Sequence, residues 1–157
     1  MCEYCGCQSL TTIDELTREH DEVVNLISHV RDARRDGDTD RMAELARRIG
    51  EVLEPHTEVE EHGLFPALAD DFPEQMAALE EEHRLVESVL AEAAAGTPRD
   101  ADWPERLIRT LDLLRLHILK EQDGVFPAAL AALSTEQWEA VEAVRARAGT
   151  RMEQPTG

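Results

Sequence analysis

Four histidines interrupt the apolar stripes of a sequence that otherwise reads as helical, and their spacing constrains the fold more than any other feature. They are His20, His56, His83 and His117. Each consecutive pair is centred on a turn: at residue 38, between residues 69 and 70, and at residue 100. Residues equidistant from a turn between antiparallel helices lie at the same height, because the rise per residue is constant. The spacing therefore predicts antiparallel helices with all four histidines in one layer.

Turn and capping signals divide the chain into five helical segments, and no segment alternates with period two. A capping-box pattern places the first helix start near Thr12 and the last near Ser134. We expect an all-α fold: an up-down-up-down four-helix bundle with a short C-terminal helix and a Cys-rich N-terminal arm. The expected domains are the arm at 1–11, the bundle at 12–132, and the C-terminal helix and tail at 133–157.

A 3.6-residue period places apolar side chains on one face of each expected helix, and Trp103 and Trp138 are expected to anchor the packing. The expected core residues are Ile13, Leu16, Val23, Ile27, Val30, Leu45, Ile49, Val52, Gly63, Ala67, Met76, Leu79, Val86, Leu90, Leu107, Leu114, Val125 and Ala128.

The sequence also repeats itself in pairs of helices. HTEVEEHGLFPAL at 56–68 corresponds to HILKEQDGVFPAAL at 117–130, and EHDEVV at 19–24 corresponds to EHRLVE at 82–87. Each half supplies one isolated histidine and one His-x-x-x-Glu pair, which ends at Glu60 or at Glu121. Residues four apart lie on the same face of a helix, so each pair projects side by side. The repeat predicts two half-sites that are related by approximate symmetry and face each other.

A layer of four imidazoles and two carboxylates inside a small bundle needs compensation. Burying a polar group without a hydrogen bond costs about 2–7 kcal/mol, and an unpaired charge costs more. His–Glu hydrogen bonds could compensate any single histidine, but for the whole layer a metal centre is the favoured hypothesis. Imidazole and carboxylate suit iron, manganese, zinc or copper. Six ligands exceed the four of a tetrahedral zinc, and two carboxylates, one from each half, suit a bridged pair of ions.

The order His, His-x-x-x-Glu, His, His-x-x-x-Glu over residues 12–132 resembles the hemerythrin-like domain, also called the hemerythrin/HHE cation-binding domain. The phrases EEHGLFPAL and EQDGVFPAAL strengthen the resemblance, because this family often follows the ligand Glu with Leu-Phe-Pro. The resemblance implies an up-and-down bundle that holds two Fe ions in an oxo- or hydroxo-bridged di-iron centre. The metal ligands that it implies, with the two glutamates bridging, are His20, His56, Glu60, His83, His117 and Glu121.

Two positions depart from the oxygen-carrying hemerythrins. Their third helix supplies two histidines four apart, whereas Leu79 and Glu87 flank His83 here at that spacing. Their last carboxylate is an Asp five residues after its histidine, whereas here a Glu comes after four and Gln122 takes the fifth place. Fewer nitrogen ligands leave more open metal positions, which disfavours simple oxygen carriage. Glu87 is a candidate extra ligand.

The predicted function is a non-haem di-iron protein that binds or reacts with O2, peroxide or nitric oxide, with catalase-like or peroxidase-like turnover as its enzymatic version. The alternatives are a sensor of oxygen, iron or redox state, and a metal store without turnover. The expected partners are a small diatomic or peroxide ligand and an electron donor or thiol partner.

Charge and cysteine content set the expected surroundings. The net charge of −18 argues against nucleic acid and anionic membrane surfaces as partners. The start of the sequence, MCEYCGCQSL, is too polar for a signal peptide, so we expect a cytoplasmic protein. Three interpretations apply to Cys2, Cys5 and Cys7: reactive thiols on an arm, a reversible disulfide, or part of a metal site.

Four polar residues near the predicted site are expected at the surface. His29 falls on the face opposite His20, and His62 lies off the apolar stripe. Glu58 and Glu61 are expected on a solvated helix edge rather than among the ligands.

Overall fold

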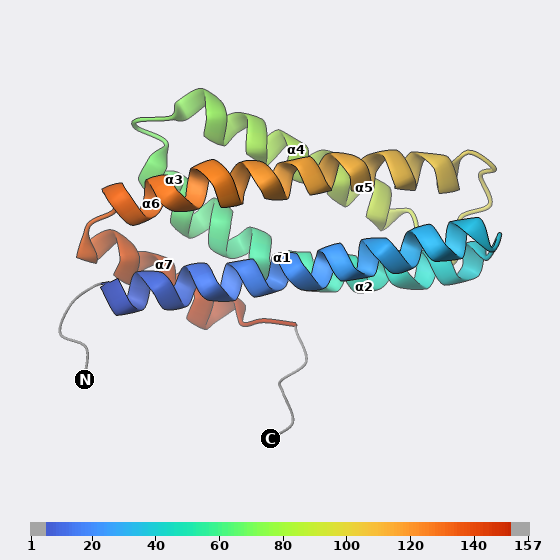
Figure 1. The fold of residues 1–157 in the computed structure, drawn as a ribbon, viewed down its shortest axis with the longest axis horizontal. Coiled ribbons are helices and arrows are strands. Elements are labelled where there is room, and N and C mark those ends of the chain that lie inside the picture. Colours follow the sequence, from blue (N-terminus) through green and yellow to red (C-terminus); the bar gives the residue numbers. More distant parts are fainter. Residues whose placement is uncertain (1–5, 152–157) are drawn as a thin grey trace, which may run out of the picture.

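The computed structural model describes residues 6–151, with side chains from residue 9 onward. Every regular element among these residues is helical, so the all-α prediction is confirmed. The long helices run back and forth along one axis (Figure 1). No helix among the described residues is long and apolar enough to cross a membrane. The elements are α1 (Gly6–Arg35), α2 (Thr39–Val59), η1 (Glu60–Leu64), α3 (Phe65–Leu68), α4 (Pro73–Ala91), α5 (Trp103–Lys120), η2 (Glu121–Val125), α6 (Phe126–Ala132) and α7 (Thr135–Ala148).

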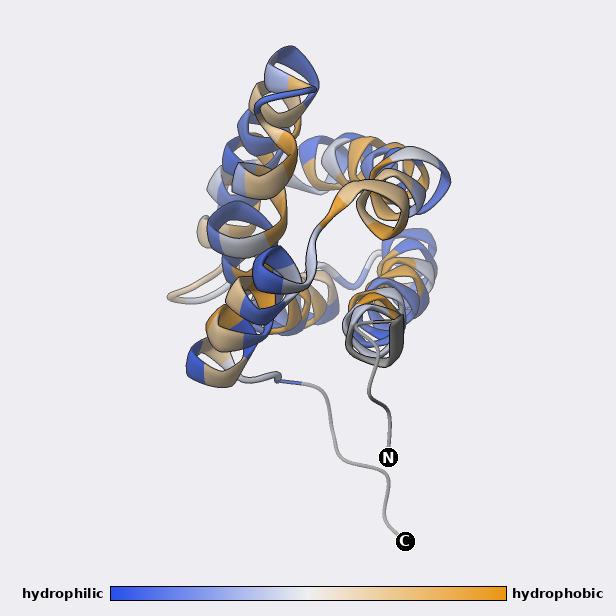
Figure 2. Ribbon diagram, turned by 90° about the vertical axis from the view of Figure 1, so that its left-hand side faces the viewer, coloured by the Kyte–Doolittle hydropathy of each residue, from blue (hydrophilic) through white to orange (hydrophobic). Residues whose placement is uncertain are grey.

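Four rods make up the bundle: α1; α2 with η1 and α3; α4; and α5 with η2 and α6. Each rod packs against two neighbours, α1 against α2 and α5, and α4 against α2 and α5. Hydrophobic residues face the middle of the bundle and hydrophilic residues face outward (Figure 2). This is the contact pattern of a four-helix bundle. The additional helix α7 packs on α1, α2 and η1.

The apolar core consists of two clusters. One lies toward the α1–α2 turn and includes the buried residues Ile49, Trp103 and Leu111. The other lies toward α7 and includes Phe65 and Trp138. Both tryptophans are buried, as predicted, and apart from Ile118, which follows His117, the two clusters lie on opposite sides of the site histidine of each rod. The bundle is therefore apolar above and below the layer of histidines.

Both Phe-Pro phrases lie at π-helical turns. η1 and η2 each begin at the Glu of a His-x-x-x-Glu pair and end just before the Phe. Proline has no N–H and its ring crowds the carbonyl four residues back, so Pro66 and Pro127 each disfavour a straight α-helix. In η1 the N–H of Phe65 instead reaches the carbonyl of Glu60, five residues back, and η2 repeats this bond. The sequence had predicted uninterrupted helices at both places.

The first helix starts earlier than predicted. α1 begins at Gly6, whereas the capping-box pattern had placed the start near Thr12. Thr12 is buried inside the helix, and α1 packs against α6 and α7 as well as against its bundle neighbours. Tertiary packing therefore outweighs the capping signal. Of the predicted arm, Cys2 and Cys5 lie outside the described residues, and Cys7 lies in α1 with its side chain outside the description.

The predicted capping box opens α7. The Ser134 hydroxyl accepts from the N–H of Gln137 at 3.2 Å, and Gln137 Oε1 accepts from the N–H of Ser134 at 2.8 Å. Gly63 lets α7 approach η1 closely, because a Cβ at Gly63 would lie 3.1 Å from the Cα of Val141. The helix therefore packs directly on the π turn that begins with Glu60.

Candidate metal centre

The six residues that the sequence proposed as ligands meet in one buried layer. Every rod contributes one histidine, and every π turn contributes its first residue. All six side chains are buried, and both glutamates are completely buried. The residues of the layer are His20, His56, Glu60, His83, His117 and Glu121.

The carboxylate of Glu60 faces two histidines from different halves of the bundle. Its Oε2 lies 3.2 Å from Nε2 of His56, and its Oε1 lies 3.1 Å from Nε2 of His83. His56 belongs to the same rod as Glu60, whereas His83 comes from α4 across the seam. One oxygen is therefore directed to each half.

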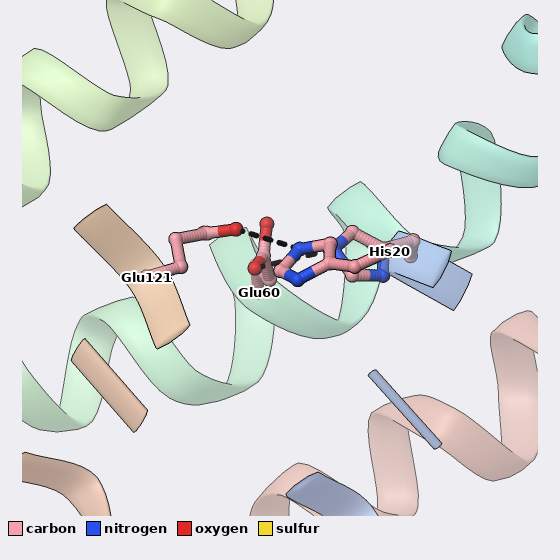
Figure 3. A group of neighbouring side chains, drawn as sticks. His20, Glu60 and Glu121 are labelled. Carbon is pink, nitrogen blue, oxygen red and sulfur yellow. Dashed lines mark hydrogen bonds and ion pairs between the residues drawn. The ribbon is translucent and has the colours of Figure 1, made fainter. Parts of the chain in front are cut away.

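Glu121 occupies the corresponding place in the second half. Its Oε1 lies 3.0 Å from Nε2 of His20, and its Oε2 lies 3.5 Å from Nε2 of His117. Glu121, Glu60 and His20 point toward one another from three different elements (Figure 3). Two groups of candidate ligand atoms share both carboxylates, and the atoms within each group lie within 4.8 Å of one another. The groups are His20, His56, Glu60, Glu121 and Glu60, His83, His117, Glu121.

Several of these atoms lie at ion-pair distance from each other but make no hydrogen bond of suitable geometry among the described residues. They are both carboxylate oxygens of Glu60, Oε2 of Glu121 and Nε2 of His117. Buried polar atoms of this kind are normally satisfied, and leaving them unpaired is costly. Imidazole nitrogens and carboxylate oxygens in this number fit a pair of transition-metal ions such as iron, which would supply the missing partners.

A comparison with protein families agrees with this geometry, since the model of the hemerythrin HHE cation binding domain matches residues 11–129. The chain belongs to this family. The family predicted from the sequence is confirmed, and the chain is a cation-binding protein whose buried His and Glu groups can hold metal. No curated protein and no solved structure matches the chain.

In this hemerythrin HHE domain, carboxylates also contact the outer nitrogens of three histidines. Glu19 Oε1 lies 3.0 Å from Nδ1 of His56, and Glu82 Oε1 lies 2.9 Å from Nδ1 of His117. A carboxylate on Nδ1 fixes the tautomer that directs the Nε2 lone pair toward a metal. Neither glutamate was predicted from the sequence, although the repeated Glu-His pairs in EHDEVV and EHRLVE mark both positions.

The third outer carboxylate is Glu61, and the prediction that it lies on a solvated edge is wrong. Its side chain is only 15% exposed, and its Oε2 lies 2.6 Å from Nδ1 of His83. Arg84 donates a hydrogen bond to the same oxygen. A π turn holds more residues than an α turn, so each residue advances by a smaller angle. Glu61 is the second residue of this turn, and its carboxylate faces His83 instead of solvent.

His20 is the exception among the four histidines. Its Nδ1 is buried without a hydrogen-bond partner in the described part of the chain. Its ring stacks on Phe126, with centroids 5.5 Å apart and planes inclined by 10°. In the duplicated half, the residue equivalent to Glu61 is Gln122, directly after Glu121. A neutral amide stands where the other half has a carboxylate, so the two ligand groups have unequal outer support.

The carboxylates hold protons on the histidines of the metal-free protein. Burial lowers the pKa of His56, but Glu60 and Glu19 outweigh it and raise this pKa to about 10. Burial also opposes the shift at His117, where Glu121 and the other carboxylates raise the pKa to about 9. Burial raises the pKa of Glu60, yet the charge of His56 dominates and keeps it well below the usual value. A metal ion must therefore displace protons from the layer.

Helix α7 holds Glu19 from a second side. Arg145 donates from Nη2 to Oε1 at 2.7 Å and from Nη1 to Oε2 at 2.9 Å, and Thr150 donates to Oε2 at 2.9 Å. Burial raises the pKa of Glu19, but His56 and Arg145 lower it to about 2. The sequence had assigned no role at the site to the last helix, which fixes the carboxylate that orients His56.

The remaining predicted residues lie outside the layer. Glu87, the candidate extra ligand, is on the surface of α4, where it pairs with Arg84 at 3.3 Å. The structure therefore does not bring Glu87 to the histidines. His29 is exposed, and His62 is exposed and lies 3.6 Å from Glu58, both as predicted.

Proposed function

We propose that the layer holds two iron ions in a non-haem di-iron centre that reacts with O2, peroxide or nitric oxide. The placement of Glu60 carries this proposal, because its two oxygens face histidines of different halves at 3.2 and 3.1 Å. A carboxylate directed in this way is suited to bridging two ions. Glu121 faces the other two histidines in the same manner.

The number of ligand atoms favours a reactive metal centre over a closed structural one. Each group offers one ligand atom from each of four residues, fewer than an octahedral ion takes. Bound iron would supply one-electron redox chemistry at the open positions. The protein's own part is to hold the imidazoles in place through Glu19, Glu61 and Glu82, and to cover the layer with an apolar cluster above and below it.

Peroxide turnover, in a catalase-like or peroxidase-like form, is the activity that we propose first. A peroxidase-like cycle also requires an electron donor or thiol partner, and we propose the cytoplasm as the compartment. A sensor or a metal store would use the same ligands without turnover, so the rate of peroxide loss separates these functions.

Elemental analysis of protein purified without added metal tests the centre, and peroxide decay tests the reaction. We expect about two irons per chain, loss of both in Glu60→Ala, and loss of peroxide decay in His117→Ala. His29→Ala changes an exposed histidine on α1 and serves as the matched control, which keeps both properties. One zinc per chain, or full iron in Glu60→Ala, would contradict the paired centre. Two irons per chain without any loss of peroxide would favour a metal store without turnover.

A further inference from the structure

A cleft of about 480 Å³ lies along the seam between α2 and α4 and reaches the metal layer. All four site histidines line its inner part. From the layer it extends along α2 as far as Ala46, and on the opposite side to Ala94, just beyond the end of α4. His56 and Ala46 are separated by ten residues, which corresponds to about 15 Å along a helix. The cleft is therefore an elongated passage and not a small hole beside the metals.

Apolar and small residues make up half of those that line the cleft beyond the layer. The larger apolar residues are Leu53, Val86, Leu90, Leu114 and Ile118, and the small ones are Ala46, Gly50, Ala91 and Ala94. At Gly50 the wall is open, because a Cβ added there would meet no atom within 4 Å.

Two arginines cross the seam, one toward each end of the cleft. Near the layer, Arg84 on α4 donates to Glu61 on η1. At the far end, Arg47 on α2 donates to the carbonyl of Ala93 at 2.9 Å. Both cations are therefore engaged in contacts between the rods. The open stretch lies between the two crossings, where Gly50 leaves space.

The rim of the cleft is acidic. Glu51, Glu54, Glu58 and Glu87 line it and are exposed. The protein as a whole carries a net charge of −18, and this field opposes the approach of anions. Neutral molecules are not affected in this way, and the apolar wall favours their burial.

The size of the cleft sets the class of molecule that it accommodates. One water takes about 30 Å³ of liquid, and a diatomic or hydrogen peroxide needs little more. Cavities of about 300–1,000 Å³ with mainly apolar walls and a few polar groups are typical of sites for organic ligands. We propose that the cleft binds a neutral, elongated organic molecule, with its apolar tail along the α2–α4 seam and an oxygen-bearing head group, a hydroxyl or hydroperoxide, at the metal layer. The proposal rests on the proposed function, since the metals are the reason for the head group to lie there.

Calorimetric titration with 1-butanol, 1-hexanol, 1-octanol and octanoate tests this binding without any redox step. The protein is used as purified, with its metal content measured. We expect affinity for the alcohols to rise by up to about fourfold with each added methylene, and octanoate to bind at least tenfold more weakly than 1-octanol. Equal affinity for 1-butanol and 1-octanol would overturn the apolar cleft. Octanoate binding as tightly as 1-octanol would overturn the selection for neutral molecules.

Two substitutions at one position locate the binding. Gly50→Phe fills the open stretch and is expected to weaken 1-octanol binding at least tenfold, whereas Gly50→Ala adds one methyl group and is expected to bind nearly as well as the wild type. Ala78→Phe is the control, because it adds the same ring to an exposed position of α4 that does not line the cleft. Unchanged 1-octanol affinity in Gly50→Phe would place the binding elsewhere and overturn the proposal.

The two proposals fail separately. Normal iron content and peroxide decay without 1-octanol binding would remove the organic ligand and leave the di-iron function intact. Chain-length-dependent binding that Gly50→Phe abolishes, in a protein that reacts with no oxidant, would remove the redox function and leave the cleft as a binding site.

Discussion

Glu19 on α1 lies 3.0 Å from the outer nitrogen of His56 on α2, and the second half repeats this relationship between Glu82 and His117 at 2.9 Å. In each case the carboxylate of one helix contacts the imidazole of the next. The internal duplication therefore includes the groups behind the ligands as well as the ligands themselves. Such outer carboxylates make the ligating nitrogen more basic and keep the ring in position.

The Glu82→Gln substitution tests the effect of an outer carboxylate on metal affinity, and it leaves the six candidate ligands unchanged. An amide can still accept a hydrogen bond from His117 but carries no charge, so the imidazole becomes a weaker donor. We expect metal affinity to fall by about 10-fold to 100-fold, measured by competition with a chelator. Glu81→Gln changes the exposed neighbour and should leave the affinity unchanged. Equal affinities in the two variants would show that the Glu82 contact is only structural.

Arg145 is expected to stabilise the fold through Glu19. Its removal leaves the buried carboxylate of Glu19 with His56 as its remaining cationic partner, so the cost is at most about 3–5 kcal/mol, the value for a broken buried ion pair. Urea denaturation of the metal-free protein should therefore give a lower free energy of unfolding for Arg145→Met than for the wild type, by up to this amount. Arg147→Met, on the exposed side of the same helix, should stay within about 0.5 kcal/mol of the wild type. A similar result for both variants would mean that α7 does not hold the site.

The stability of the metal-free protein should decline on the alkaline side. The pKa of His56 is raised from 6.5 to about 10 by Glu60 and Glu19 against the effect of burial, and that of His117 is raised to about 9. A raised folded-state pKa contributes stability that is complete below the unfolded value and is lost as pH rises through the folded value. The urea midpoint should therefore fall between pH 6.5 and pH 10.

On the acid side, the stability of the metal-free protein depends on pH with the opposite sign. The pKa of Glu19 is lowered from 4.5 to about 2, so its contribution is present above pH 4.5 and is lost as pH falls toward 2. Together the two effects place maximum metal-free stability between about pH 4.5 and pH 6.5. His56→Gln should flatten the alkaline decline. A midpoint that rises from pH 6.5 to pH 9 would contradict the ion-paired layer.

Gln122→Glu should make the two metal positions more alike. His20 has a buried Nδ1 without a partner in the described chain, and Gln122 stands where the other half has Glu61. The metals should leave the wild type in two distinct steps during chelator titration, because no outer carboxylate supports Nδ1 of His20 in the first ligand group. In Gln122→Glu the steps should move together, and in Glu61→Gln the second position should weaken. A single step in the wild type would rule out this inequality.

The layer of six residues was predictable because it depends only on helix geometry. A constant rise and antiparallel packing convert the positions of His20, His56, His83 and His117 into a common height. The outer carboxylates were not predictable in the same way. Whether a polar residue beside the ligands faces inward depends on local rotation, and the π turn changes that rotation at Glu61.

Long-range contacts account for the other differences between sequence and structure. Arg145 reaches Glu19 across 126 residues, and no local pattern in α7 marks that contact. α1 begins at Gly6 in spite of the capping signal at Thr12, and it packs against α6 and α7, which are distant in sequence. The Phe-Pro phrases did indicate an irregular helix, because a proline inside a helical pattern disfavours a regular α-helical turn before it.

The two π turns contain equivalent glycines with different surroundings, and this gives a paired test of how α7 packs. A Cβ at Gly63 would lie 3.1 Å from the backbone of Val141, which cannot move aside like a flexible side chain, whereas a Cβ at Gly124 would meet nothing within 4 Å. Gly63→Ala should therefore destabilise the protein by about 1–3 kcal/mol through overpacking. Gly124→Ala should stabilise it by about 0.4–1 kcal/mol, because it restricts the unfolded chain. Urea denaturation of the metal-free protein measures both, and a stabilising Gly63→Ala would show that α7 can move away from η1 at no cost.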